Sequence, residues 1–167
     1  MTGLDVSAPR QELALRFDAN AVYDSESSAL ADFEANPDRN PAVVIEATGR
    51  PGMIAPAMRM AGWMGRVVLL GSTRGAVDYV DFYGIHRKGL TIIGAHELTR
   101  PNKESRRNNW TSWDDTTAVL EFIRRGSLSY DTLITDMFSP EDAAKAYAAI
   151  NNPDSSIIVD FDWTRST

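Results

Sequence analysis

The sequence predicts an α/β protein built around a mainly parallel sheet. Three observations support this fold class. Short apolar runs alternate along the chain with longer helical patterns, which is typical of successive βαβ units. The runs at 42–47 and 66–71 carry aliphatic residues on both faces, as expected for buried parallel strands. The length of 167 residues is enough for a substantial core.

The first third of the chain is predicted to hold two short strands and two helices. Residues 3–6 form the tail of a strand, and Ser7 suits the N-cap of the next helix, with Pro9 in its first turn. A second strand is expected at Ala21–Tyr23, and a polar helix at 27–34.

The middle of the chain is predicted to supply three buried strands, at 42–47, 66–71 and 90–94. An apolar helix at 53–61 joins the first of them to the second. A short helix at 78–86 is expected before the third strand.

A strong amphipathic helix is predicted at 111–125. Thr111 or Ser112 can cap its start, where acidic residues follow, and arginines at its other end complement the helix dipole. Its apolar residues are expected to face inward, namely Val119, Leu120, Phe122 and Ile123. The elements expected after it are a strand, a helix and a closing strand, at 133–138, 140–150 and 156–161.

The composition limits the classes of partner. A formal net charge of -6 disfavours binding to phosphate backbones, and the densest cationic stretch, 100–107, is interpreted as a solvated loop. No apolar segment approaches the ~20 residues that span a bilayer, and no signal-peptide pattern follows Met1. We therefore expect a cytoplasmic protein that binds neither nucleic acid nor membranes.

Several phrases of the sequence resemble the medium-chain dehydrogenase/reductase family, the zinc-type alcohol dehydrogenases. Three come from its nucleotide domain: Val-Val-Ile-Glu-Ala-Thr-Gly at 43–49, Gly-Arg-Val-Val-Leu-Leu-Gly at 65–71 and His-Arg-Lys-Gly-Leu-Thr-Ile-Ile-Gly at 86–94. Others, at 133–135, 138–143 and 146–147, resemble the family's return to its catalytic domain. The resemblance implies a truncated Rossmann-like parallel sheet with helices on both faces, plus a C-terminal strand-helix-strand segment. It also implies a partial dinucleotide-binding domain at 1–130 and a segment derived from the catalytic domain at 131–167.

The same resemblance implies a cofactor site. Asp5 is similar to the acidic residue that ends the family's second nucleotide-domain strand and accepts hydrogen bonds from the adenosine ribose, which favours NAD over NADP. The alternative is a solvated carboxylate at a strand end. Arg10 stands where a family side chain often covers the adenine.

Ligands of open α/β sheets bind at the carboxyl ends of the strands. The candidates there, which by resemblance approach the ribose and nicotinamide, are Thr48, Gly49, Leu70, Gly71, Ser72, Gly94 and Ala95. The alternative is that these glycines only make tight turns. His96 follows the last of these strand ends and is a candidate for facing the ligand.

Two parts of a complete family member are not found in the sequence. None of the 11 glycines belongs to a Gly-x-Gly-x-x-Gly turn, and no GroES-like domain precedes Asp5. The family's strand order 3-2-1-4-5-6 would then lack its central strand. The two halves could pair directly, a second copy could fill the slot, or the chain could fold differently.

No metal site is expected. The family's catalytic zinc ligands include a cysteine, and this sequence has none. His86 and His96 are its only histidines, and neither has a partner at zinc-site spacing. His86 is interpreted as a partly buried structural histidine.

One departure from the family pattern predicts a backbone conformation. Where the family usually has Gly-Ala-Asp or Gly-Ala-Glu, this chain has Asp18-Ala19-Asn20. Glycine there relieves a left-handed turn, which aspartate tolerates less easily. The resemblance therefore implies a left-handed turn at this position.

The function expected is that of a truncated NAD(P)-dependent alcohol or polyol dehydrogenase, without catalytic residues and without dehydrogenase activity on its own. Its NAD binding would be weak or vestigial. The alternative is a non-enzymatic nucleotide-binding or oligomerisation module. In either case we expect a homo-oligomer formed through the strand at 90–94 or through bare sheet edges.

Overall fold

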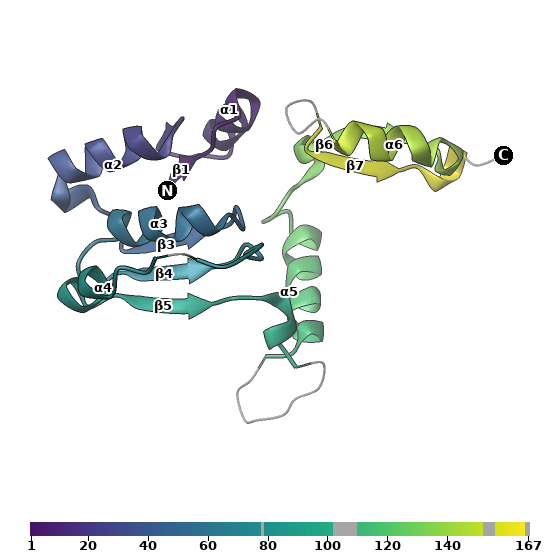
Figure 1. Ribbon diagram of the computed structural model, residues 1–167. Coiled ribbons are helices and arrows are strands. Elements are labelled where there is room, and N and C mark those ends of the chain that lie inside the picture. The colour runs from purple at the N-terminus through teal and green to yellow at the C-terminus, as the bar shows by residue number, and fades with distance from the viewer. Residues whose placement is uncertain (78, 102–109, 152–155, 166–167) are drawn as a thin grey trace. The chain divides into compact units, whose positions relative to one another are not determined.

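The computed structural model describes residues 1–77, 79–101, 110–151 and 156–165. The start of the helix expected at 78–86 and most of the cationic stretch therefore lie outside the described residues. The chain divides into two compact units (Figure 1). Unit 1 comprises 1–6 and 18–100, and unit 2 comprises 7–17 and 101–167. The domain boundary expected at 130 is not tested by this division and stays a prediction.

Unit 1 begins with a two-stranded parallel sheet. Strand β1 (Thr2–Leu4) pairs with β2 (Ala21–Tyr23), with Leu4 opposite Tyr23. The ladder continues one residue further, because the Asp5 amide donates to the Tyr23 carbonyl (3.1 Å). Helix α2 (Glu26–Ala35) follows, and its N-cap Ser25 accepts from the amide of Ser28.

A second, three-stranded parallel sheet follows in unit 1. Its strands are β3 (Val43–Glu46), β4 (Arg66–Leu69) and β5 (Thr91–Gly94), in that spatial order. Helices α3 (Ile54–Met60) and α4 (Phe82–Lys88) connect them. The α/β class with parallel strands is thus confirmed, and each predicted strand lies within one or two residues of its observed bounds.

The two sheets of unit 1 share one helical layer. Leu4 from β1 and Val44 from β3 both pack against a cluster centred on Leu30 and Phe33 of α2 and Met60 of α3. Figure 1 shows α3 beside both α2 and β3. Within the described part of unit 1, no ladder joins β1 to β3, so direct pairing of the two halves is not observed. The contact between the halves is made through side chains on the helices instead.

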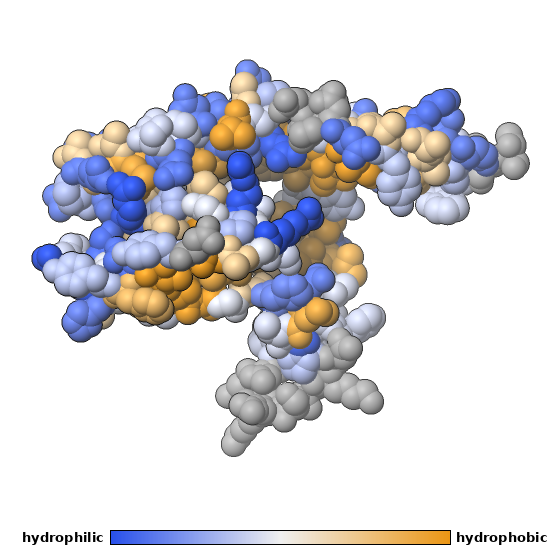
Figure 2. Space-filling model, viewed as in Figure 1, coloured by the Kyte–Doolittle hydropathy of each residue, from blue (hydrophilic) through white to orange (hydrophobic). Residues whose placement is uncertain are grey.

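Helix α3 covers one face of the three-stranded sheet. Its Ala57 and Met58 pack with Val67, whose side chain is fully buried. The alternate residues of β3, Val43 and Ile45, are 46% and 61% exposed, because they point to the other face. Figure 2 shows hydrophobic residues gathered along this sheet on the face in view.

Unit 2 contains the predicted strand-helix-strand segment. Strand β6 (Ile134–Phe138) pairs in parallel with β7 (Ile158–Phe161), and α6 (Ala143–Ile150) connects them. Helices α1 (Ala8–Arg16) and α5 (Ser112–Arg124) also belong to this unit. Short 3-10 helices across both units lie at Pro37–Arg39, Pro51–Met53, Glu97–Thr99, Asp131–Leu133, Pro140–Asp142 and Trp163–Arg165.

Helix α5 confirms one expectation and corrects another. Thr111 caps it in a capping box with Asp114, as its sequence predicts. Its apolar side chains were expected to face inward, yet Val119, Leu120 and Phe122 are 45%, 60% and 51% exposed. Helical periodicity determines which residues share a face, but it does not determine whether another element packs against that face.

The predicted left-handed turn is present. Asp18 has φ 62, so an aspartate occupies the backbone region that glycine adopts most readily. Among the described residues, no helix is both long enough and apolar enough to cross a bilayer.

Candidate functional site

An open groove of about 1000 Å³ lies at the carboxyl ends of β3 and β4. Three parts of unit 1 form it: the end of β1, the start of α2 and the loops after β3 and β4. The residues lining it are Leu4, Val6, Ser25, Glu26, Ala47, Thr48, Gly49, Arg50, Pro51, Gly52, Met53, Gly71, Ser72 and Arg74. The groove therefore lies where open α/β sheets bind their ligands.

The loop after β3 is shaped by Glu46, which is only 5% exposed. Its carboxylate accepts hydrogen bonds from the Thr48 amide (2.7 Å), the Thr48 hydroxyl and the Gly49 amide (3.3 Å). Its backbone carbonyl accepts from the amides of Leu70 and Gly71, both at 2.9 Å. One buried acid thus fixes its own loop and joins it to the loop after β4.

The two loops touch backbone to backbone, and their glycines make this contact possible. A Cβ on Gly71 would lie 2.3 Å from the Gly49 nitrogen. A Cβ on Gly49, which has φ +67, would lie 2.5 Å from the Ser72 carbonyl oxygen. The amide of Arg74 donates to the Gly49 carbonyl (3.1 Å). These glycines therefore have a packing role whatever binds in the groove, and their role toward a ligand stays a prediction.

The opposite wall comes from β1 and α2. Leu4 and Val6 line the groove, and Asp5 lies between them at the end of the β1 ladder. Next to this wall, the Ser28 hydroxyl donates to Asp24 (2.8 Å) and, with Ser25, holds the pKa of that carboxyl below its usual value. Glu26, in the first turn of α2, completes a wall that carries negative charge.

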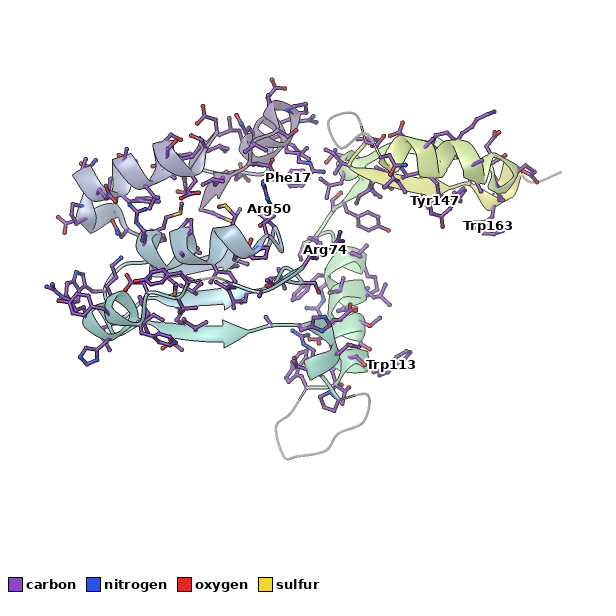
Figure 3. All side chains as sticks on the ribbon, viewed as in Figure 1. Phe17, Arg50, Arg74, Trp113, Tyr147 and Trp163 are labelled. Carbon is purple, nitrogen blue, oxygen red and sulfur yellow. The ribbon has the colours of Figure 1, made fainter. Side chains whose placement is uncertain are left out.

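Two arginines on the loop wall were not among the predicted site residues. Arg50 follows Gly49 directly, and Arg74 lies three residues beyond Gly71. Both are exposed at the loop end of the three-stranded sheet, as Figure 3 shows. Their sequence signal is weak, because a basic residue in a loop is usually only solvated.

The structure brings some predicted residues together and not others. Thr48, Gly49, Gly71 and Ser72 all line the groove. Leu70 is 53% exposed and is not part of the lining.

The end of β5 contributes nothing to the lining. Gly94 and Ala95 end this outer strand, where the Ala95 amide donates to the Leu69 carbonyl (3.0 Å). His96 is exposed, and its Nδ1 accepts from the Leu98 amide (3.1 Å), which caps a 3-10 turn. Arg10 belongs to α1 in unit 2. Ligand roles for all four residues stay predictions.

The residues do not fit a zinc site. The sequence has no cysteine. His86 is exposed in the last turn of α4, which corrects the expectation of a partly buried histidine. The helix extends further than predicted, to Gly89 as a left-handed C-cap. Across the part of the chain that the structure describes, no three His, Cys, Asp or Glu residues gather closely enough to hold a metal ion.

Known proteins show the same fold. A galactitol-1-phosphate dehydrogenase from Escherichia coli is 23% identical, with a TM-score of 0.69 over 91% of this chain and 43% of that chain. A short chain alcohol dehydrogenase from Escherichia coli CFT073, solved in complex with NADH, is 20% identical, with a TM-score of 0.77 over 95% of this chain and 43% of that one. Benzyl alcohol dehydrogenase from Acinetobacter calcoaceticus is 18% identical, with a TM-score of 0.76 over 95% of this chain and 41% of that chain.

These likenesses show the fold, and this chain spans less than half the length of each of these dehydrogenases. No curated protein matches the sequence. The family model described as zinc-binding dehydrogenase matches residues 1–113, from β1 through the start of α5 and so over both sheets of unit 1. Because that match covers more than half of the chain, the protein belongs to the zinc-binding dehydrogenase family.

Proposed function

We propose that unit 1 binds NAD(H) in the groove at the carboxyl ends of β3 and β4. The observation that carries the proposal is the convergence of Thr48, Gly49, Gly71 and Ser72 on one groove of about 1000 Å³. That volume is at the upper end of the range for small-molecule sites. A relative of the same fold was solved with NADH bound.

The residues of the groove fit the cofactor. Gly49 and Gly71 let the two loops of this wall pack backbone to backbone, which brings Thr48 and Ser72 to the same groove. Asp5, which ends the β1 ladder next to the lining residues Leu4 and Val6, would accept hydrogen bonds from the ribose hydroxyls. Thr48 and Ser72, which line the other wall, would flank the ligand. The nicotinamide ring of bound NAD supplies the acceptor for a hydride.

We further propose that this chain alone does not oxidise alcohols. Zinc ligands in the family include a cysteine, which this sequence does not have, and its two histidines lie in separate elements. A panel of alcohols and polyols, incubated with the purified chain and NAD, should produce no NADH absorbance above that of a protein-free control. Saturable turnover of any of these alcohols would contradict this part of the proposal.

Calorimetric titration with NADH tests the binding proposal. We expect saturable binding with a Kd of roughly 1 mM or tighter, equivalent to about 4 kcal/mol. Nicotinamide mononucleotide and ADP-ribose, titrated separately, show which half of the dinucleotide contributes affinity. An absence of heat and of competition at several millimolar NADH would overturn the proposal.

A second candidate function is assembly, because β5 is the outer strand of its sheet and presents Ile92 and Ile93, each 39% exposed. We propose that this strand or the other bare sheet edges join copies of the chain into a homo-oligomer. Light scattering at micromolar concentration should give at least a dimer mass, and Ile93→Lys should lower it. A monomeric wild-type chain would contradict the assembly proposal.

A further inference from the structure

The two arginines of the groove come from loops that are joined by a backbone hydrogen bond. Arg50 directly follows Gly49, and the carbonyl of Gly49 accepts the amide of Arg74 at 3.1 Å. The Arg50 amide is itself fixed, since it donates to the Thr48 hydroxyl (3.1 Å). Both arginines therefore project from two loops that are hydrogen-bonded to each other, as Figure 3 shows.

Neither guanidinium is engaged in an ion pair within the described residues. Elsewhere in unit 1, Arg39 pairs with Asp32 and Arg59 pairs with Glu34. Arg50 and Arg74 have exposed side chains, and neither takes part in a salt bridge with another described residue. The guanidinium groups of Arg50 and Arg74, neither of which forms an ion pair with a described residue, thus belong to the same wall of the groove.

The groove consequently has walls of opposite charge. Glu26 lines the wall made by β1 and α2. Asp5 is adjacent in the chain to the lining residues Leu4 and Val6 but is not itself part of the lining. Arg50 and Arg74 line the wall made by the loops after β3 and β4. The remaining acid near these loops, Glu46, is buried and accepts three hydrogen bonds, so its carboxylate is directed at its own loop.

A ligand that fits both walls carries hydroxyls at one end and phosphates nearby. Carboxylates accept hydrogen bonds from vicinal hydroxyls, whereas guanidinium groups bind phosphate oxygens as planar, bidentate donors. In a chain of net charge -6, an anion is repelled by the protein as a whole, so local cations decide where it can bind. Arg50 and Arg74 are the cations that line this groove.

We propose that Arg50 and Arg74 bind the phosphate groups of the ligand, so that side-chain charge performs the task for which many nucleotide domains use a glycine-rich turn. The site then takes nucleoside diphosphates and their conjugates as a class. This inference rests on the proposed nucleotide function and adds to it the groups that hold the phosphates. Binding held by side-chain charge is sensitive to salt, because mobile ions screen exposed charges.

The test compares the wild-type chain with Arg50→Gln/Arg74→Gln by calorimetry, with NADH, ADP-ribose and inorganic pyrophosphate as separate ligands. The double variant should lose roughly tenfold or more in affinity for each, since charge-assisted hydrogen bonds are lost. The matched control is Arg66→Gln, which removes an exposed arginine at the amino end of β4, away from the groove. Its affinities should stay within about twofold of wild type.

A second variant separates charge from geometry. Arg50→Lys/Arg74→Lys keeps both charges but removes the planar forks, and its affinity should lie between those of the wild type and the glutamine variant. Raising the ionic strength should weaken pyrophosphate binding to the wild-type chain and have little effect on the glutamine variant.

The outcomes distinguish the two proposals. If the glutamine variant binds NADH as tightly as wild type, the phosphate assignment is overturned while NAD binding stands. If pyrophosphate and ADP-ribose bind through the arginines but NADH neither binds nor competes with ADP-ribose, the phosphate assignment stands and the NAD(H) proposal fails. If none of the three ligands binds the wild-type chain, both proposals are overturned.

Discussion

The carboxylate of Glu46 accepts a hydrogen bond from the backbone amide of Thr48 at 2.7 Å, although only one residue separates them in the chain. The same side chain also accepts the Thr48 hydroxyl and the Gly49 amide. It is buried at the end of an apolar strand, where an acid without partners would be costly. The contact closes the loop that forms one wall of the groove.

Glu46→Gln should therefore destabilise the fold. Glutamine keeps one acceptor oxygen but directs an amide group at a backbone N–H, leaving a buried donor without a partner, which costs roughly 1–3 kcal/mol. Urea unfolding measures the change. The control is Glu34→Gln, which removes an exposed partner of Arg59 and should change the free energy of unfolding by about 0.5 kcal/mol or less. Equal effects from the two substitutions would show that Glu46 does not organise the loop.

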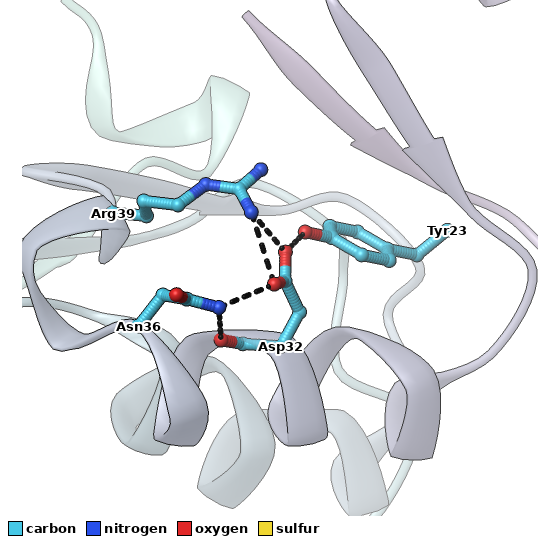
Figure 4. Close-up of polar contacts among 4 residues, drawn as sticks. All are labelled: Tyr23, Asp32, Asn36 and Arg39. Carbon is cyan, nitrogen blue, oxygen red and sulfur yellow. Dashed lines mark hydrogen bonds and ion pairs between the residues drawn. The ribbon is translucent and has the colours of Figure 1, made fainter.

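Tyr23→Phe should lower the free energy of unfolding by an amount that depends on pH, because it removes the contact between Tyr23 and Asp32. The Tyr23 hydroxyl donates to Asp32, which also accepts from Asn36 and pairs with Arg39 (Figure 4). The Tyr23 bond is the main cause that lowers the pKa of Asp32 below 3.8, and Asp32 in turn raises the pKa of Tyr23 above 10.0.

The sign follows from these two directions. The lowered pKa of Asp32 contributes stability above pH 3.8 that is lost as pH falls through the folded-state pKa. The raised pKa of Tyr23 contributes stability below pH 10.0 that is lost as pH rises through the folded-state pKa. The difference in free energy of unfolding between wild type and Tyr23→Phe should therefore be largest between pH 3.8 and pH 10.0, and it should decrease at lower and at higher pH. Exposed Tyr79→Phe is the control, and a gap constant from pH 3 to pH 8 would contradict the assignment.

Lys88→Met should destabilise unit 1 through the end of α3. The Lys88 ammonium donates to the carbonyls of Arg59 (2.7 Å), Ala61 (2.8 Å) and Met58 (3.4 Å), which terminate that helix. Removing it should cost roughly 1–3 kcal/mol, measured by thermal or urea unfolding. Lys145→Met removes an exposed ion pair with Asp142 and should cost about 0.5 kcal/mol at most. A Lys88→Met chain as stable as the Lys145→Met control would refute this capping role.

Asp5→Asn should narrow the preference for NADH over NADPH. A carboxylate favours free ribose hydroxyls and repels a 2′-phosphate, so its loss should weaken NADH binding roughly tenfold and leave NADPH binding unchanged or improved. Competition titrations of both nucleotides measure the ratio. Asp38→Asn, in the 3-10 turn after α2, is a control of equal charge change. An unchanged ratio in Asp5→Asn would remove Asp5 from the ribose site.

Periodicity and strand ends predicted much of this architecture. Strand β2 was predicted at its observed bounds, and Asp18 is left-handed as its place in the sequence indicates. Thr48 and Ser72 meet because the carboxyl ends of neighbouring parallel strands lie side by side. These features follow from local patterns or from the handedness of βαβ units.

Other features depend on contacts that no local pattern contains. In the sequence, Glu46 is only an acidic residue at the end of an apolar strand. Its hydrogen bonds depend on the conformation of the loop that follows and could not be predicted. The sequence does not show that Arg50 and Arg74 line the same groove, because their loops come together only through the hydrogen bond to the Gly49 carbonyl. Phe122 of α5 is exposed although the apolar face of that helix predicts burial. Burial also requires another element to pack against the face, and helical periodicity does not identify that element.

The most direct test of NAD(H) binding at this groove is a titration of the isotope-labelled chain with NADH, followed by amide NMR shifts. The amides of Thr48, Gly49, Gly71 and Ser72, which come from two separate loops, should shift together along one saturable curve. Residues of α6, in unit 2, provide the internal reference and should not move. Shifts confined to residues outside the groove, or no shifts at several millimolar NADH, would contradict the account.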